Sequence, residues 1–147
     1  MDPSAISEAL EQIPFTVDMG VVVEHASKSE VCMTLSDKRS NQNMVGIVHA
    51  GALFTFGETV AGIAAGFDTL DKAFPLARNA SIEYKRPARG DIRATAVVPG
   101  SESDRVVTEL DRDGRSELDV IVSLEDTQGE QVAEMNVHYS FRPREKR

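Results

Sequence analysis

The segment 45–67, VGIVHAGALFTFGETVAGIAAGF, decides how this chain folds. Glu58 is the only formally charged side chain among its 23 residues, and apolar neighbours flank it near the middle of a predicted helix. An unpaired carboxylate in apolar surroundings costs several kcal/mol, so a chain keeps one chiefly when it does chemistry or makes a specific contact. Asn43, His49 and Gly51 lie just upstream, and their residue types can share a site with this carboxylate.

The same segment is long enough to cross a bilayer, so a transmembrane helix has to be considered. Its glycines, its carboxylate and the lack of nearby Lys or Arg anchors argue against a membrane span, and the segments that follow alternate like strands of soluble proteins. A helix that is apolar on all sides in a soluble protein is wrapped by other structure. We therefore expect a buried central helix and no contact with a membrane.

The rest of the chain supplies a sheet that can wrap this helix. The pattern predicts a short helix over 3–12, opened by Asp2 as N-cap and ended before Pro14. Alternation of apolar and polar residues predicts strands over 21–23, 31–35, 80–84, 92–98, 105–111, 115–125 and 133–141.

Short turns connect the predicted strands. Segment 105–111 is expected to pair with 115–125 across the turn 111–114, and residues 127–129 turn the chain into the last strand. Strands joined by short turns are antiparallel. The sequence thus predicts an α+β fold, in which an antiparallel sheet wraps around one long central helix.

Composition limits the class of protein. A chain of 147 residues with 41% hydrophobic content is expected to form a single domain over 1–147 with its own core. The net charge of −8 argues against general nucleic-acid binding but leaves room for a local basic patch. A single cysteine, Cys32, and a start without a secretory signal predict the cytoplasm. Residues 142–147 are expected to form a solvated basic tail.

Several chemistries find no support in the sequence. The three histidines are scattered without metal-ligand spacing, and Cys32 has no identifiable partner. Phosphate-loop and serine-hydrolase motifs are missing. We expect neither a metal nor a cofactor.

The segment 43–58, NMVGIVHAGALFTFGE, together with this outline resembles the hotdog-fold acyl-CoA thioesterases of the PaaI-like group. In that family the active site is lined by an Asn, a His six residues later, a Gly-Gly pair, and an Asp or Glu nine residues past the His. Asn43, His49, Gly51 and Glu58 fall at those spacings. The resemblance covers about residues 15–141 in arrangement, and it implies a hotdog fold that hydrolyses acyl-CoA.

This chain departs from the family pattern at three positions. Ala50 stands where the family often has the first Gly, and Glu58 replaces the commoner Asp, which adds one methylene of reach. Gly62 stands where some relatives carry a Thr, one turn past the acidic residue.

The residues themselves supply the parts for thioester hydrolysis. The reaction needs a donor for the developing oxyanion and a carboxylate that attacks the carbonyl or activates water. If the helix begins near Ala50, its first N–H groups are free donors, and Gly51 leaves room for close approach. Glu58 is then the nucleophile or general base.

Gly51 and Glu58 are too far apart to act on one carbonyl within one chain. Seven residues of helix separate them by about 10 Å. A site shared between two chains resolves this, and the resemblance implies the same, since hotdog thioesterases place the helix start of one subunit against the acidic residue of the other. We expect a homodimer or a homotetramer built from two dimers.

The candidate residues also have structural alternatives. Glu58 can pair with a buried Arg or cap a partner backbone. His49 is more often a residue that hydrogen-bonds backbone near a helix start, so we predict a positioning role for it. Asn41 competes with Asn43, since both lie in a turn-prone loop, but only Asn43 has the family register and is expected to orient water or the thioester carbonyl.

An acyl-CoA substrate carries phosphates, which an acidic protein has to hold with a local cationic patch. Lys85, Arg86 and Arg89, at a strand end and its turn, are the predicted phosphate-binding residues. Solvated charges at a strand end are the alternative interpretation.

A second hypothesis is a non-catalytic acyl-CoA-binding or regulatory hotdog module, which Ala50 and Gly62 favour. Glu58 and Asn43 favour the enzyme, because an apolar acyl pocket has no need of a charge in its wall. The acyl group stays open, since the phenylalanines can border an aliphatic or an aryl pocket. These are Phe54, Phe56, Phe67 and Phe74.

Overall fold

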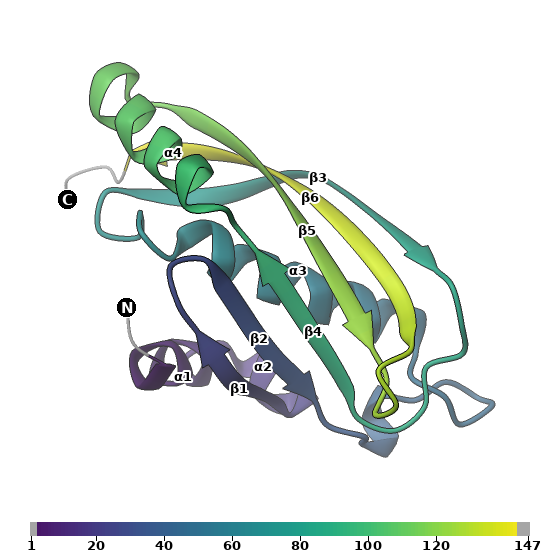
Figure 1. Ribbon diagram of the computed structural model, residues 1–147. Coiled ribbons are helices and arrows are strands. Elements are labelled where there is room, and N and C mark those ends of the chain that lie inside the picture. Colours follow the sequence, from purple (N-terminus) through teal and green to yellow (C-terminus); the bar gives the residue numbers. More distant parts are fainter. Residues whose placement is uncertain (1–2, 144–147) are drawn as a thin grey trace.

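The computed structural model describes residues 3–143, so the predicted N-cap Asp2 and residues 144–147 of the predicted tail lie outside it. An antiparallel sheet curls around one long helix (Figure 1). The elements in chain order are α1 (Pro3–Glu11), α2 (Pro14–Met19), β1 (Val21–Ala26), β2 (Glu30–Leu35), η1 (Arg39–Asn41), α3 (Ala50–Gly66), β3 (Ala73–Tyr84), β4 (Ile92–Val97), α4 (Gly100–Asp113), β5 (Ser116–Glu125) and β6 (Gln131–Pro143).

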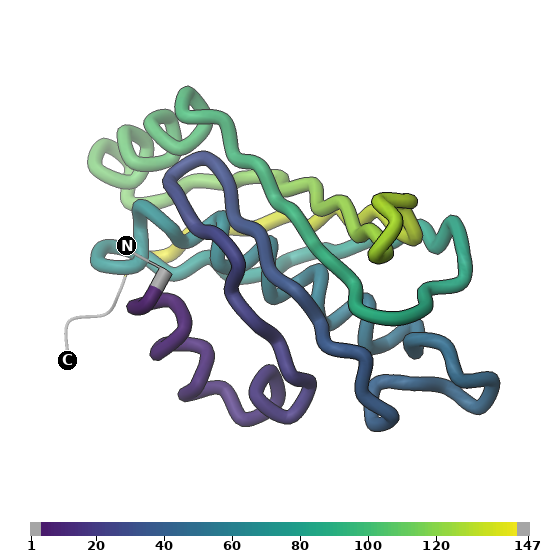
Figure 2. Tube along the Cα trace, turned by 60° about the horizontal axis from the view of Figure 1, so that its bottom comes forward, coloured from purple at the N-terminus to yellow at the C-terminus, as the bar shows by residue number. Residues whose placement is uncertain are grey.

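The sheet has six strands in the order β1-β2-β4-β5-β6-β3, and every neighbouring pair is antiparallel. β1 and β3 form its two edges. Helices α1 and α2 lie beside β1, and the loop between η1 and α3 extends away from the sheet (Figures 1 and 2). The predicted sheet around a central helix is confirmed.

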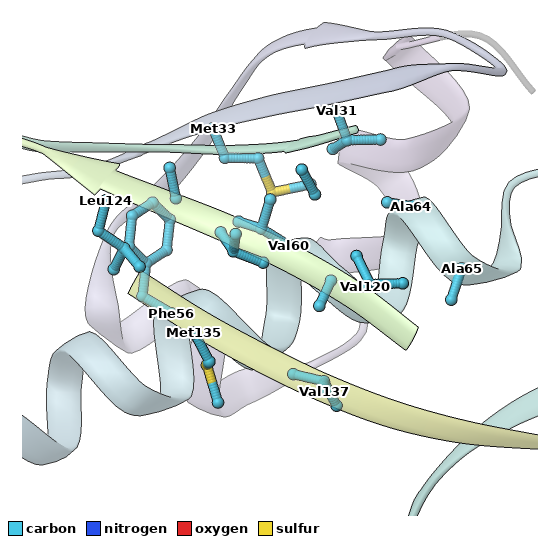
Figure 3. Packing of buried hydrophobic residues seen from close by; sticks show 14 of the residues in the cluster. Val31, Met33, Phe56, Val60, Ala64, Ala65, Val120, Leu124, Met135 and Val137 are labelled. Carbon is cyan, nitrogen blue, oxygen red and sulfur yellow. The ribbon is translucent and has the colours of Figure 1, made fainter. Parts of the chain in front are cut away.

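Helix α3 is held by the apolar face that it turns toward the sheet (Figure 3). Phe56 and Val60 are fully buried there, among side chains of β2, β5 and β6. Phe56 therefore belongs to the core and is no wall of a ligand pocket. No helix within residues 3–143 combines the length and apolar character that a bilayer crossing requires.

Gly57 sets how closely α3 approaches the sheet. A Cβ at this position would lie 2.8 Å from the Met135 sulfur on β6, which is shorter than real contacts allow. The absence of a side chain at Gly57 thus lets α3 pack closely against β6.

The predicted strand over 105–111 is wrong, because these residues belong to helix α4. Its buried residues Ser103, Val106 and Leu110 follow the three- and four-residue spacing of one helix face, not the alternation of a strand. Arg105 pairs with Glu102 and Glu109 along the helix.

The predicted turn at 111–114 is the end of α4. Gly114 stops the helix with φ of 67°, a conformation that glycine adopts without strain. The chain then enters β5 directly.

Three further boundaries differ from the prediction. Helix α2 was missed, although Pro14 at its first turn and the left-handed Gly20 after its end are ordinary helix signals. β3 begins at Ala73 rather than Ala80, because its first half is mostly exposed and carries Pro75, so it shows little alternation. Arg142, assigned to the tail, belongs to the end of β6.

Gly57→Val is expected to lower the free energy of unfolding by about 2 kcal/mol, since the added methyl groups must displace Met135 or lift the helix. Urea unfolding followed by circular dichroism measures the change. Gly100→Val is the matched control, because a Cβ at Gly100 meets nothing within 4 Å. Equal losses in the two variants would contradict the close approach of α3 to β6.

Candidate active site

His49 caps the start of α3 with its own side chain. Its Nδ1 accepts a hydrogen bond from the Gly51 N–H at 2.9 Å. The bond requires a lone pair on Nδ1, so a neutral ring carries its proton on Nε2. The residue itself is exposed. A Cβ on Gly51 would lie 3.1 Å from Nδ1, so the glycine makes room for this ring.

The helix starts at Ala50, as predicted, and leaves free donors in its first turn. The N–H of Gly51 is already accepted by His49, and the Leu53 N–H by the His49 carbonyl. The Ala50 and Ala52 N–H groups have no acceptor within residues 3–143. They are the unsatisfied donors that carry the partial positive charge of the helix end.

Ala50 fits this position without strain. No residue other than glycine has a positive φ in the part of the chain that the structure describes, so Ala50 occupies ordinary backbone space. Its carbonyl accepts a hydrogen bond from the Tyr84 hydroxyl at 2.9 Å. The departure from a Gly-Gly pair thus leaves the helix start intact.

Asn43 shapes the loop that leads into α3. Its Oδ1 accepts from the N–H groups of Val45 and Ile47, at 3.0 and 3.3 Å. Asn41 is buried, and its amide donates to the carbonyls of Met19 and Ser36. Asn41 is therefore used within the fold, whereas the amide nitrogen of Asn43 has no acceptor in residues 3–143.

Glu58 is half-buried at mid-helix, and no cation within residues 3–143 forms an ion pair with it. Its contact is Tyr139 on β6, whose hydroxyl oxygen lies 3.3 Å from Oε1 and 3.2 Å from the Glu58 carbonyl oxygen. Burial, then the charge of Glu58 and this hydrogen bond, raise the pKa of Tyr139 well above its usual range. Tyr139 is thus a protonated donor at neutral pH.

Two clefts flank the start of α3. The first, of about 450 Å³, has His49, Gly51 and Thr55 in its wall, opposite Phe15 and Met19 of the α2 segment. The second, of about 340 Å³, lies between the loop before α3 and the end of β3. Its lining includes Asn43, Ala50, Tyr84, Lys85 and Arg86.

The structure divides most of the predicted site residues between the two clefts. His49 and Gly51 line the first cleft, whereas Asn43 lines the second with Lys85 and Arg86, so the start of α3 lies between the two groups. Glu58 lines neither cleft, because it lies two helical turns further along α3. The predicted separation of donors and carboxylate within one chain is therefore present.

The basic residues differ in their contacts. Lys85 donates to Gln131 at 2.8 Å, and Arg86 lies 3.4 Å from Glu130 across the β5–β6 turn. Arg89 is exposed and lies outside the lining of the second cleft. Lys85 and Arg86, two of the three predicted cations, thus line the same cleft as Asn43.

Sequence reasoning missed Tyr139 and Tyr84, which contact Glu58 and Ala50. Both lie on strands far from the 43–58 segment, and neither contact follows from local spacing. The one sequence signal for the Tyr139 contact was Gly62. Its missing side chain, one turn past Glu58, leaves a space that a side chain from another element can fill.

The fold and the helix-start geometry define a hotdog-fold protein. A family model described as a domain of unknown function (DUF4442) matches residues 3–140, and the chain belongs to this family. No curated protein matches it.

Solved structures share the architecture and confirm the predicted hotdog fold. A Pseudomonas aeruginosa protein described as of unknown function, "Probable Thioesterase", is 30% identical, with 90% of this chain and 89% of that chain covered and a TM-score of 0.83. A Chlorobaculum tepidum protein of unknown function is 16% identical, with 96% of each chain covered and a TM-score of 0.84. A thioesterase family protein from Silicibacter pomeroyi is 17% identical, with 94% of this chain and 96% of that chain covered and a TM-score of 0.77.

The raised pKa of Tyr139 predicts a loss of stability in alkali. In the unfolded chain the Tyr139 phenol ionises near pH 10, whereas in the folded protein it keeps its proton above that pH. The contribution of Tyr139 to the free energy of unfolding is therefore complete below pH 10 and is lost as the pH rises above it. The difference in free energy of unfolding between wild type and Tyr139→Phe is expected to fall by about 1.4 kcal/mol from pH 9 to pH 11. Urea unfolding at both pH values measures it, and a difference that stays constant would contradict a buried, neutral Tyr139.

Proposed function

We propose that this protein is an acyl-CoA thioesterase of the PaaI-like type, with Glu58 as nucleophile or general base. The observation that carries the proposal is a carboxylate without a cation partner in residues 3–143, on the same helix as two free N–H donors. The 30% identical Pseudomonas aeruginosa protein, described as a "Probable Thioesterase", supports the reaction class.

The helix start is the oxyanion site in this proposal. The Ala50 and Ala52 N–H groups donate to the thioester oxygen as it becomes negative, and the helix dipole adds to their effect. The Gly51 N–H is bonded to His49, so the role of Gly51 is to leave room for the substrate through its lack of a side chain. His49 positions the first turn, and Asn43 orients the water or the thioester carbonyl through its free amide.

Glu58 acts on the carbonyl carbon in one of two ways. As a general base it takes a proton from water, whose oxygen bonds to the carbon, and the C–S bond then breaks to release the acid and the CoA thiolate. As a nucleophile it bonds to the carbon itself, CoA leaves as thiolate, and water hydrolyses the resulting anhydride. Both routes need the carboxylate in its charged form.

One site needs two chains, because about 10 Å of helix separates the donors from Glu58. A homodimer, or a tetramer of two dimers, brings the helix start of one subunit to Glu58 of the other. β3 supports this assembly, since it is a twelve-residue edge strand that pairs only with β6 among the described strands. Large apolar side chains are exposed on β3 at Leu76, and around the start of α3 at Met44, Val45 and Phe54.

The two clefts suggest where the substrate lies. The first, with Phe15, Met19 and Ala52, suits the acyl group, which its volume of about 450 Å³ limits to a modest aliphatic chain or an aryl group. The second leads to Lys85 and Arg86, which with Arg89 hold the CoA phosphates.

A non-catalytic acyl-CoA-binding module is the second candidate. The hydrogen bond between His49 and the Gly51 N–H favours it, because a donor expected for the oxyanion is already occupied. In that case the clefts bind acyl-CoA and no thiol is released.

Glu58→Gln is expected to reduce turnover at least 100-fold, because an amide neither attacks nor takes a proton. Release of free thiol from short, medium, long and aryl acyl-CoAs measures turnover, and equilibrium binding is measured alongside. Glu8→Gln, an exposed change on α1, is the matched control. A wild type that binds acyl-CoA without releasing thiol would establish the binding module instead.

Lys85→Ala/Arg86→Ala is expected to raise KM for the preferred acyl-CoA about tenfold, equivalent to about 1.4 kcal/mol of lost phosphate binding. The KM for the matching acyl-pantetheine, which lacks the nucleotide, stays unchanged. Arg112→Ala, an exposed change on α4, is the control. Equal effects on both substrates would show that these cations do not bind the nucleotide phosphates.

A further inference from the structure

The side chain of Tyr139 reaches Glu58 from the face of the sheet that packs against α3. Tyr139 lies on β6, is 1% exposed, and places its hydroxyl oxygen 3.3 Å from Oε1 and 3.2 Å from the backbone carbonyl oxygen of Glu58. A tyrosine hydroxyl has one proton to donate, so these two oxygens share it or compete for it. A buried hydroxyl without such a partner would be costly.

Gly62 opens the space for this contact. A Cβ at Gly62 would lie 3.3 Å from the Tyr139 hydroxyl oxygen and 3.9 Å from Glu58 Oε1. The position lies within α3 and has no positive φ, so the backbone does not require a glycine there. A glycine inside a helix costs roughly 1 kcal/mol relative to alanine, which points to a use for the empty space.

We propose that Tyr139 is a positioning residue, whose hydroxyl holds Oε1 of Glu58 so that Oε2 is left to act, and that Gly62 is kept small to admit it. The inference rests on the proposed function of Glu58. It deepens that function by naming what orients the carboxylate.

The acceptor of the Tyr139 proton separates this role from a purely structural one. If the Tyr139 proton goes to the backbone carbonyl, loss of the hydroxyl affects stability alone. If it goes to Oε1, loss of the hydroxyl frees a side chain with three rotatable bonds at the reacting atom, and a misplaced reacting group costs up to about 100-fold in rate.

Tyr139→Phe tests the role in steady-state kinetics on the preferred acyl-CoA. The expected result is a 10- to 100-fold fall in kcat with KM changed less than about twofold. A kcat within twofold of the wild type, or a fall matched by a rise in KM, would overturn the proposal. Thermal unfolding in parallel shows that the variant is folded under the assay conditions.

A rescue variant keeps the test decisive if Tyr139→Phe weakens the fold. In Tyr139→Phe/Gly62→Ser the new hydroxyl starts from a Cβ position 3.9 Å from Oε1, and the removed phenol oxygen leaves it space. We expect kcat to recover at least threefold over Tyr139→Phe. Tyr139→Phe/Gly62→Ala is the matched control, and equal kcat in the two double variants would overturn the proposal.

Tyrosine fluorescence distinguishes failure of this inference from failure of the enzyme assignment. The chain has two tyrosines and no tryptophan, so Tyr139 is the only emitter in Tyr84→Phe. A carboxylate that accepts the phenol proton quenches emission, so adding Glu58→Gln is expected to raise it. Unchanged emission on adding Glu58→Gln would overturn the contact between Tyr139 and Glu58. If emission rises but the wild-type protein has no thioesterase activity, the contact is upheld and the enzyme assignment is rejected.

Discussion

The close packing of α3 against β6 is the constraint on which the rest of the structure depends. Gly57 removes the side chain that would hold the helix away from Met135, and Phe56 and Val60 then fill the space inside the curled sheet. Since one face of α3 is buried in this way, its opposite face remains open. Glu58 lies at the border between the two faces, half-buried, where it reaches both a core tyrosine and the exterior.

This packing also explains why the helix start is a suitable place for chemistry. Ala50 and Gly51 at the start of α3 are exposed, so the first turn of the helix lies at the surface and not in the core. His49 uses one of them to fix the first turn and leaves those of Ala50 and Ala52. The same helix therefore offers donors at its end and an anion at its middle, and the proposed second copy brings the two together.

The central helix and most strands were predictable from the sequence because their patterns are local. Segment 45–67 is almost free of charge, and the strands near 115–125 and 133–141 alternate over their whole length. The error at 105–111 arose because Val106, Val107 and Thr108 are β-branched, although the ion pairs of Arg105 and the end at Gly114 favour a helix.

The candidate site was predictable only where its residues are close in sequence. Asn43, His49 and Gly51 flank the start of α3 because one short loop connects them, and the sequence displays its spacing. The contact between Tyr139 and Glu58 joins residues 81 positions apart, and it depends on the register of β6 beneath the helix. No local pattern specifies that register.

A subunit-mixing assay tests most directly the central claim, that one active site takes its donors and its carboxylate from two chains. Glu58→Gln and Gly51→Val chains, each inactive alone, are unfolded together, refolded at equal amounts and assayed for thiol release from acyl-CoA. Half of the dimers are then mixed and each has one intact site, so the account predicts about a quarter of wild-type activity. Mixed dimers that form without any activity would contradict it.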